Sequence, residues 1–159
     1  MNQRAWSGPL TEFFADDRHN VGTVRWSKDG QKKYRWVKFN NGTANVTATV
    51  GMLVNYFAAS LGAGTFIVTP DVSDGDAKPI GAGQLQAIVT DGYYCWIQVE
   101  GISAVLPTDL TAGAIGDRLT AIGADDGTWD VEVTGAIQQT CGIALNVTAS
   151  SQVVLLQCP

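Results

Sequence analysis

The sequence contains one histidine, His19. An imidazole can serve as a general base or as a metal ligand. A catalytic role would need a nucleophile or a carboxylate held against the ring. His19 lies between Arg18 and Asn20 in an N-terminal stretch without regular periodicity, and no GxSxG, P-loop or HExxH motif occurs. We therefore expect an isolated, exposed histidine, no catalytic residue and no enzyme.

Three closely spaced carboxylates, Asp71, Asp74 and Asp76, could surround a hard cation such as Ca²⁺ on a glycine-containing turn. The segment lacks the distal glutamate of an EF-hand, and Asp-Gly pairs are ordinary turn chemistry. The sequence favours a plain turn and leaves cation binding at these three residues open. Asp125-Asp126-Gly127 also contains an Asp-Gly pair that is typical of turns, and it is expected at the tip of a hairpin.

The three cysteines, Cys95, Cys141 and Cys158, are widely spaced and include no CxxC pair. With a single histidine to share, a structural zinc site is not expected, and no other metal or cofactor is implied. The first residues contain no apolar run that would form a signal peptide or a membrane span. We expect synthesis in a reducing cytoplasm, no membrane partner, and three free, dispensable thiols.

Six cations alternate with four aromatic residues between residues 25 and 39. Such a pattern could bind nucleic acid, could be a hairpin with core aromatics and solvated cations, or could contact an acidic protein surface. The net charge is −5, and eleven of the fifteen acids follow residue 39. That balance argues against a nucleic-acid partner. The side chains expected in a subunit or capsid contact are Arg25, Lys28, Lys32, Lys33, Arg35, Tyr93 and Tyr94.

The chain that positions these side chains has the pattern of an all-β protein. From residue 21 onward, runs rich in Val, Ile, Thr and aromatic residues alternate with turn residues such as Asp29-Gly30 and Asn41-Gly42. About eight to ten such runs without a convincing amphipathic helix predict an antiparallel β-sandwich or barrel. Within residues 52–61, a short helical turn is the alternative to a strand.

The length of 159 residues fits one β-domain at 21–159 preceded by an extended N-terminal arm at 1–20. A weak internal duplication is possible, because residues 87–90 resemble residues 142–145. The arm carries apolar side chains without periodicity, so we expect it to become ordered only on a partner. The side chains expected to bind that partner are Trp6, Leu10, Phe13 and Phe14.

Two segments, YRWVKF at 34–39 and GYYCWIQVEG at 92–101, resemble patterns of small proteins from the head-assembly genes of tailed bacteriophages. Residues 142–145 and 153–156 look similar to the final strands of phage head decoration, or cement, proteins. Cys95 stands where that pattern often has glycine. The resemblance implies a homo-oligomer, a trimer or dimer, that is made in the host cytoplasm, binds the major capsid protein on the virion exterior, and stabilises the capsid by bridging.

A second hypothesis, from a different class, is a receptor- or carbohydrate-binding module of a phage fibre or head appendage. Such a module would present exposed tryptophan rings to its ligand. The tryptophans considered for this role are Trp26, Trp36, Trp96 and Trp129.

Overall fold

The computed structural model describes residues 8–57, 66–72, 77–104, 114–120, 125–132, 139–148 and 151–159. These residues form eleven strands and no helix, and the strands belong to one continuous sheet. The predicted all-β fold is confirmed. Of the stretch for which a helical turn was the alternative, residues 53–57 are a strand and residues 58–61 lie outside the described residues.

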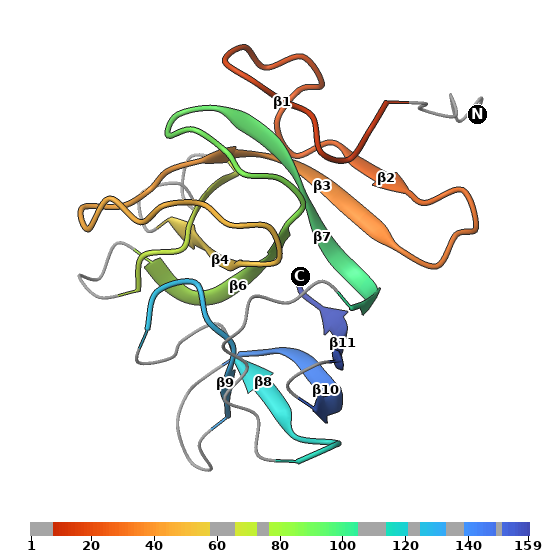
Figure 1. The fold of residues 1–159 in the computed structure, drawn as a ribbon. Helices are drawn as coiled ribbons and strands as arrows, with labels where there is room; N and C mark the ends of the chain where they lie inside the picture. Colours follow the sequence, from red (N-terminus) through yellow and green to blue (C-terminus); the bar gives the residue numbers. More distant parts are fainter. Residues whose placement is uncertain are drawn as a thin grey trace.

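Five strands close into a barrel (Figure 1). They are β3 (Lys33–Phe39), β4 (Leu53–Phe57), β5 (Ile67–Thr69), β6 (Ala77–Leu85) and β7 (Tyr94–Ser103). Strand β3 pairs with both β5 and β7, which closes the ring in the order β3-β5-β4-β6-β7. Strands β3 and β5 run parallel, whereas the other pairings of the described strands are antiparallel, so the prediction of a purely antiparallel sheet needs this correction.

The barrel interior follows from the alternation along β3 and β7. Val37 and Phe39 point inward and Trp36 points outward, as the two-residue period of a strand requires. Cys95 lies opposite Val37 and is fully buried in the barrel core, so this position accepts a thiol as readily as the expected glycine. Gly83 lets β6 approach β7, since a Cβ there would lie 2.5 Å from the carbonyl oxygen of Gln98.

Beyond the barrel, β7 continues into a second layer that we call the extension. It contains β11 (Ser151–Gln157), β10 (Thr140–Thr148), β8 (Arg118–Thr120) and β9 (Asp130–Val131), and it lies below the barrel in Figure 1. Its inner face forms a second core in which Trp129 and Leu156 pack against Leu53 of the barrel strand β4. Of the two segments compared for an internal duplication, residues 142–145 lie within β10 and residues 87–90 lie outside the strands.

The N-terminal segment, residues 8–20, lies across the outside of the barrel, and we call it the strap. Its strand β1 (Phe13–Phe14) pairs with Cys95 and Tyr94 of β7, and β2 (Val24–Trp26) follows it and pairs with β3. The strap consists of turns and bends around the two-residue strand β1, and it differs from an arm that orders only on a partner, because Leu10 and Phe14 pack against this same chain. Residues 1–7, and with them Trp6, lie outside the described residues.

Candidate binding surfaces

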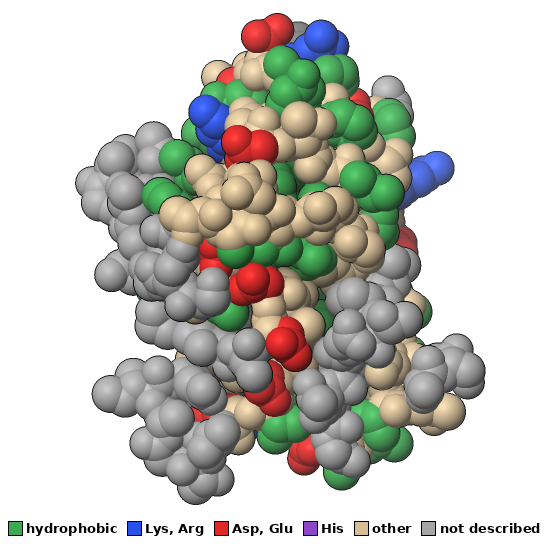
Figure 2. Space-filling model, turned by 60° about the vertical axis from the view of Figure 1, so that its left-hand side comes forward, with side chains coloured by type: hydrophobic (Ala, Val, Ile, Leu, Met, Phe, Trp, Pro, Cys, Tyr) green, Lys and Arg blue, Asp and Glu red, His purple; other side chains and the backbone are tan. Residues whose placement is uncertain are grey.

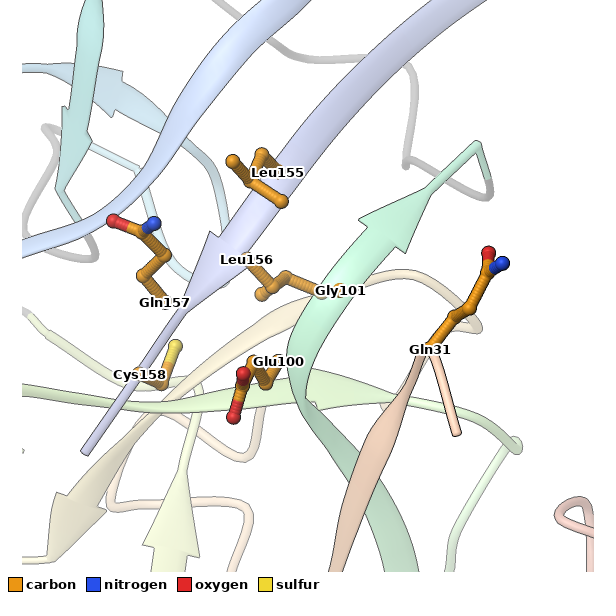
Figure 3. A pocket seen from close by; sticks show the side chains of 7 residues that line it. All are labelled: Gln31, Glu100, Gly101, Leu155, Leu156, Gln157 and Cys158. Carbon is orange, nitrogen blue, oxygen red and sulfur yellow. The ribbon is translucent and has the colours of Figure 1, made fainter. Parts of the chain in front are cut away.

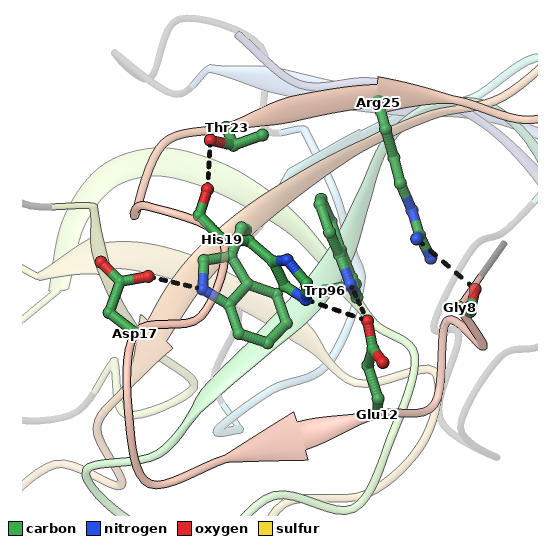
Figure 4. Close-up of polar contacts among 8 residues, drawn as sticks. Gly8, Glu12, Asp17, His19, Thr23, Arg25 and Trp96 are labelled. Atoms are coloured by element: carbon green, nitrogen blue, oxygen red, sulfur yellow. Dashed lines mark hydrogen bonds and ion pairs between the residues drawn. The ribbon is translucent and has the colours of Figure 1, made fainter. Parts of the chain in front are cut away.

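The strap is held on the barrel by two carboxylates that accept hydrogen bonds from two indoles (Figure 4). Glu12 Oε1 accepts a hydrogen bond from Trp96 Nε1 at 3.0 Å, and Asp17 Oδ1 accepts one from Trp36 Nε1 at 2.9 Å. Both tryptophans are buried, so each indole N–H needs such an acceptor. These contacts connect the strap to the outer faces of β3 and β7.

His19 is not the isolated, exposed side chain that the sequence suggested. Its ring centroid lies 4.6 Å from that of Trp36 and 5.4 Å from that of Trp96, and Nε2 lies 3.1 Å from Glu12 Oε1. The strap folds back on the barrel and carries the imidazole with it. Because the ring packs against both indoles, whose own centroids are 5.0 Å apart, the imidazole helps to fasten the strap to the barrel.

The strap also covers an aromatic cluster. Leu10 and Phe14, two of the side chains predicted to bind a capsid, pack against Trp36, Trp96 and Tyr34. Phe13 is on the opposite face of the two-residue strand and is 42% exposed. Of the three predicted capsid-binding residues that the structure describes, Phe13 is therefore the one left available on the surface.

Two of the cations predicted to contact a partner bind groups within the chain instead. The Arg25 guanidinium lies 4.1 Å from the centre of the Trp96 ring, and burial lowers the pKa of Arg25. Arg35 donates hydrogen bonds to the Tyr56 hydroxyl and, at 2.7 Å, to the carbonyl oxygen of Pro159. Both arginines therefore contribute to the fold.

The remaining members of the predicted contact set differ in exposure. Lys28 is exposed at the tip of the β2–β3 hairpin, whereas Lys32 is half-buried. Lys33 Nζ lies 4.0 Å from Glu100 Oε2. Tyr94 stacks on Trp36, with the ring centroids 6.4 Å apart, and Tyr93 is half-buried beside Phe13.

Among the described residues, the exposed large apolar side chains lie on β1 and β2, on the extension, and outside the strands at Ile88 and Ile115. One group, Phe13, Val24 and Trp26, lies on β1 and β2. A second group, Ile102 at the end of β7 and Leu145 of β10, lies on the extension. The two groups approach each other at Lys33, whose Nζ lies 5.6 Å from the centre of the Trp26 ring and 4.0 Å from Glu100 Oε2. On the face shown in Figure 2, Lys and Arg side chains lie in the upper part and carboxylates continue below them, which matches the uneven charge of the sequence.

A groove of about 440 Å³ lies where the extension leaves the barrel (Figure 3). A hydrogen bond with Cys141 and burial raise the pKa of the Cys158 thiol well above its ordinary value, so this group is not an activated nucleophile. With one carboxylate and no histidine, the groove has the composition of a shallow contact surface. Its lining residues are Gln31, Glu100, Gly101, Leu155, Leu156, Gln157 and Cys158.

Asp71 is buried and accepts a hydrogen bond from the Ala44 amide at 3.0 Å, so its carboxylate fastens a neighbouring turn. Asp74 and Asp76 lie outside the described residues. In the described ranges, no three His, Cys, Asp or Glu side chains are grouped so that they could hold a metal ion. Residues 125–127 form a turn ahead of β9, and β8 and β9 pair antiparallel as the expected hairpin requires, while residues 121–124 of the connection lie outside the described residues.

The tryptophans considered for carbohydrate binding are mostly inaccessible. Trp36, Trp96 and Trp129 are buried in the two clusters described above. Trp26, at 49% exposed, is the one of the four that could stack on a sugar. This arrangement does not favour the carbohydrate-binding hypothesis.

Sequence reasoning missed the two strap carboxylates, Glu12 and Asp17, and the exposed Ile102. The signal for the carboxylates is indirect: buried tryptophans need acceptors, but Glu12 and Trp96 are 84 residues apart in the sequence. Ile102 follows Gly101, whose positive φ accompanies the passage of β7 from the barrel into the extension. Neither relation can be read from local periodicity.

No protein-family model, curated protein or solved structure matches the chain. Among the described residues, no helix is long and apolar enough to span a membrane. The function is therefore argued from the surfaces and from the sequence resemblance.

The thiols give a direct test of the two cores. All three cysteines are free, as predicted. The pKa values of Cys95 and Cys158 are both raised, that of Cys95 to about 12, so accessibility decides the order of reaction, and Cys158 is less buried than the other two cysteines. Iodoacetamide at pH 9 is expected to alkylate Cys158 first in the folded protein, and all three cysteines at similar rates in urea. Peptide mass spectrometry measures this order, and rapid labelling of Cys95 in the folded protein would contradict the packing.

Proposed function

We propose that the chain is a structural protein of a tailed-bacteriophage virion that binds the outer surface of the head and stabilises it by bridging major capsid proteins. The observation that carries this proposal is that exposed apolar side chains lie both on β1 and β2 and on the extension, which one continuous sheet holds together. A bridging protein needs two such surfaces, because each must exclude water at a different neighbour.

The sequence resemblance adds support from the two barrel strands that carry it. Residues 34–39 form most of β3 and residues 94–101 form most of β7, and the two strands pair so that Trp36 lies opposite Trp96. The resembling segments thus form the wall that carries the strap. The resemblance therefore concerns the paired barrel strands β3 and β7 more than the side chains proposed to bind a partner.

The surface proposed to contact the major capsid protein is centred on Phe13, Val24 and Trp26, with Lys28 at the nearby hairpin tip. Large apolar rings supply most of the energy of a protein contact, and a rim cation selects an acidic partner. This set leaves out four residues that the sequence predicted for partner contacts, because they contact groups within the chain: Leu10, Phe14, Arg25 and Arg35. The protein would be made in the host cytoplasm and would end on the virion exterior, with no nucleic-acid contact.

The proposal is tested with heads that lack this chain, to which purified protein is added. The double variant Phe13→Asp/Trp26→Asp is expected to lower occupancy on the heads by at least about tenfold, since two apolar anchors become charged. Quantitative gel analysis of pelleted heads measures the occupancy.

The matched control is Ile88→Asp, which charges a side chain that is 63% exposed and lies outside both surfaces. It should bind the heads as the unchanged protein does. Equal binding by the double variant and the unchanged protein would contradict the proposed surface, and failure of the unchanged protein to bind any head would contradict the function.

A further inference from the structure

The outer face of the extension carries an apolar row that crosses three strands. Ile102 of β7 lies opposite Leu155 of β11, Leu155 lies opposite Ile143 of β10, and Ile143 lies opposite Arg118 of β8. Directly opposed residues point to the same face of a sheet, so the four side chains form one line across the extension. We call this line the outer row.

The outer row is incompletely covered, although the inner face of the same strands is well packed. Leu119, Val154 and Leu156 on the inner face are fully buried in the second core. On the outer face, Ile102 is 51% exposed and Leu155 and Ile143 are half-buried. Beside the row, Leu145 is 37% exposed and Val153 is half-buried. A contiguous apolar line on a sheet face is typical of a surface that packs against another protein.

The charges at the two ends of the outer row have opposite signs. Arg118 at the β8 end is exposed, and no carboxylate of the described residues lies within ion-pair distance of its guanidinium. Glu100, two residues before Ile102 on β7, is exposed, and its Oε2 lies 4.0 Å from Lys33 Nζ of the same chain. A surface with a cation at one end and an anion at the other is complementary to a copy of itself.

We propose that this face binds a second copy of the chain, sheet against sheet, about a two-fold axis that passes between β11 and β10. In that arrangement β7 of one copy lies over β8 of the other, and Leu155 of each copy meets Ile143 of its mate. Arg118 of each copy then lies near Glu100 of the other, which repeats the ion pair twice. The proposal concerns the purified protein and does not depend on capsid binding.

The arrangement also leaves the β1–β2 surface open. Phe13 lies opposite Cys95, seven residues before Ile102 along β7, so a dimer formed through the outer row would leave Phe13 exposed on both copies. Two copies on one particle permit bridging between neighbouring partners. Dimer formation and capsid binding are thus separate properties that can fail independently.

The first experiment measures self-association by sedimentation velocity from low to high micromolar protein. The unchanged protein is expected to pass from monomer to dimer, and Ile102→Asp is expected to weaken the dimer by about tenfold or more, because a charge replaces an apolar contact in the buried row. Leu145→Asp serves as a second variant on the same face. Ile88→Asp, at an isoleucine that is 63% exposed and lies outside the outer row, is the matched control and should dimerise normally.

The second experiment tests the orientation by charge exchange. Arg118→Glu and Glu100→Arg are each expected to weaken the dimer by about three- to tenfold, since each places like charges at both ends of the row. The double variant Arg118→Glu/Glu100→Arg should recover to within about threefold of the unchanged protein, and high salt should reduce all these differences. Thermal melting of each variant tests whether the fold is retained.

The two experiments distinguish the proposed face from its two-fold symmetry. A protein that stays monomeric throughout, a trimer, or a dimer that Ile102→Asp and Leu145→Asp leave unchanged would overturn the proposal. A dimer that both apolar variants weaken but that the double charge exchange does not recover would overturn the two-fold arrangement. Recovery in the double variant, with Ile88→Asp unaffected, supports the proposed face and its symmetry.

Discussion

Replacement of Trp96 by alanine is expected to destabilise the protein by about 3–5 kcal/mol, because truncating a buried tryptophan removes packing and leaves a cavity. The Trp96 ring lies 5.0 Å from that of Trp36 and packs beneath the Arg25 guanidinium. Its N–H also donates to Glu12, so the substitution leaves a strap carboxylate without that donor. Urea unfolding monitored by circular dichroism measures the change in free energy of unfolding.

The matched control is Trp26→Ala, which removes the same ring from a site that is about half exposed. We expect it to change the free energy of unfolding by at most about 1 kcal/mol. A similar loss for both variants would show that the aromatic cluster under the strap does not carry the stability assigned to it.

Phe14→Ala is expected to destabilise the protein by about 2 kcal/mol, less than a fully buried phenylalanine would, because the ring is half-buried. Phe14 packs against the Tyr34–Trp36–Trp96 cluster, and the guanidinium of Arg18 lies 3.8 Å from the centre of its ring. The adjacent Phe13 has the same side chain on the opposite face of β1. Phe13→Ala is expected to change the stability by no more than about 0.5 kcal/mol.

This pair of variants decides whether the strap is bound in the free protein. Thermal and urea unfolding of the isolated chain supply the measurement, with no partner present. Equal and negligible effects of Phe13→Ala and Phe14→Ala would mean that residues 8–20 do not pack on the barrel in solution. The interpretation of the strap as an arm that orders only on a partner would then be restored.

Much of the fold could be predicted from the sequence because the signals are local. The Asp29-Gly30 turn joins β2 to β3, and the alternation in residues 34–39 divides the strand between the barrel core and the outer aromatic cluster. Barrel closure could not be predicted, because it depends on β3 pairing with β5 and β7 at long range. The parallel β3–β5 pair has no signature in either strand alone.

The candidate surfaces were less predictable, because exposure depends on what folds over a residue. Arg25 and Arg35 belong to a basic segment that predicts a solvated or partner-binding face, yet each contacts distant residues of the same chain. Leu10 and Phe14 were predicted to bind a partner, but they pack against the aromatic cluster on the outside of the barrel. For Trp26 the sequence left both a core position and an exposed one open, and the ring lies on the surface because β2 is outside the barrel.

The central claim is tested most directly by cryo-electron microscopy of virions that carry this chain. The account predicts density for the barrel and extension at regular sites on the outer surface of the head, with the β1–β2 surface against the major capsid protein. Density for the chain in a tail fibre, inside the shell, or absent from the head lattice would contradict the proposed function.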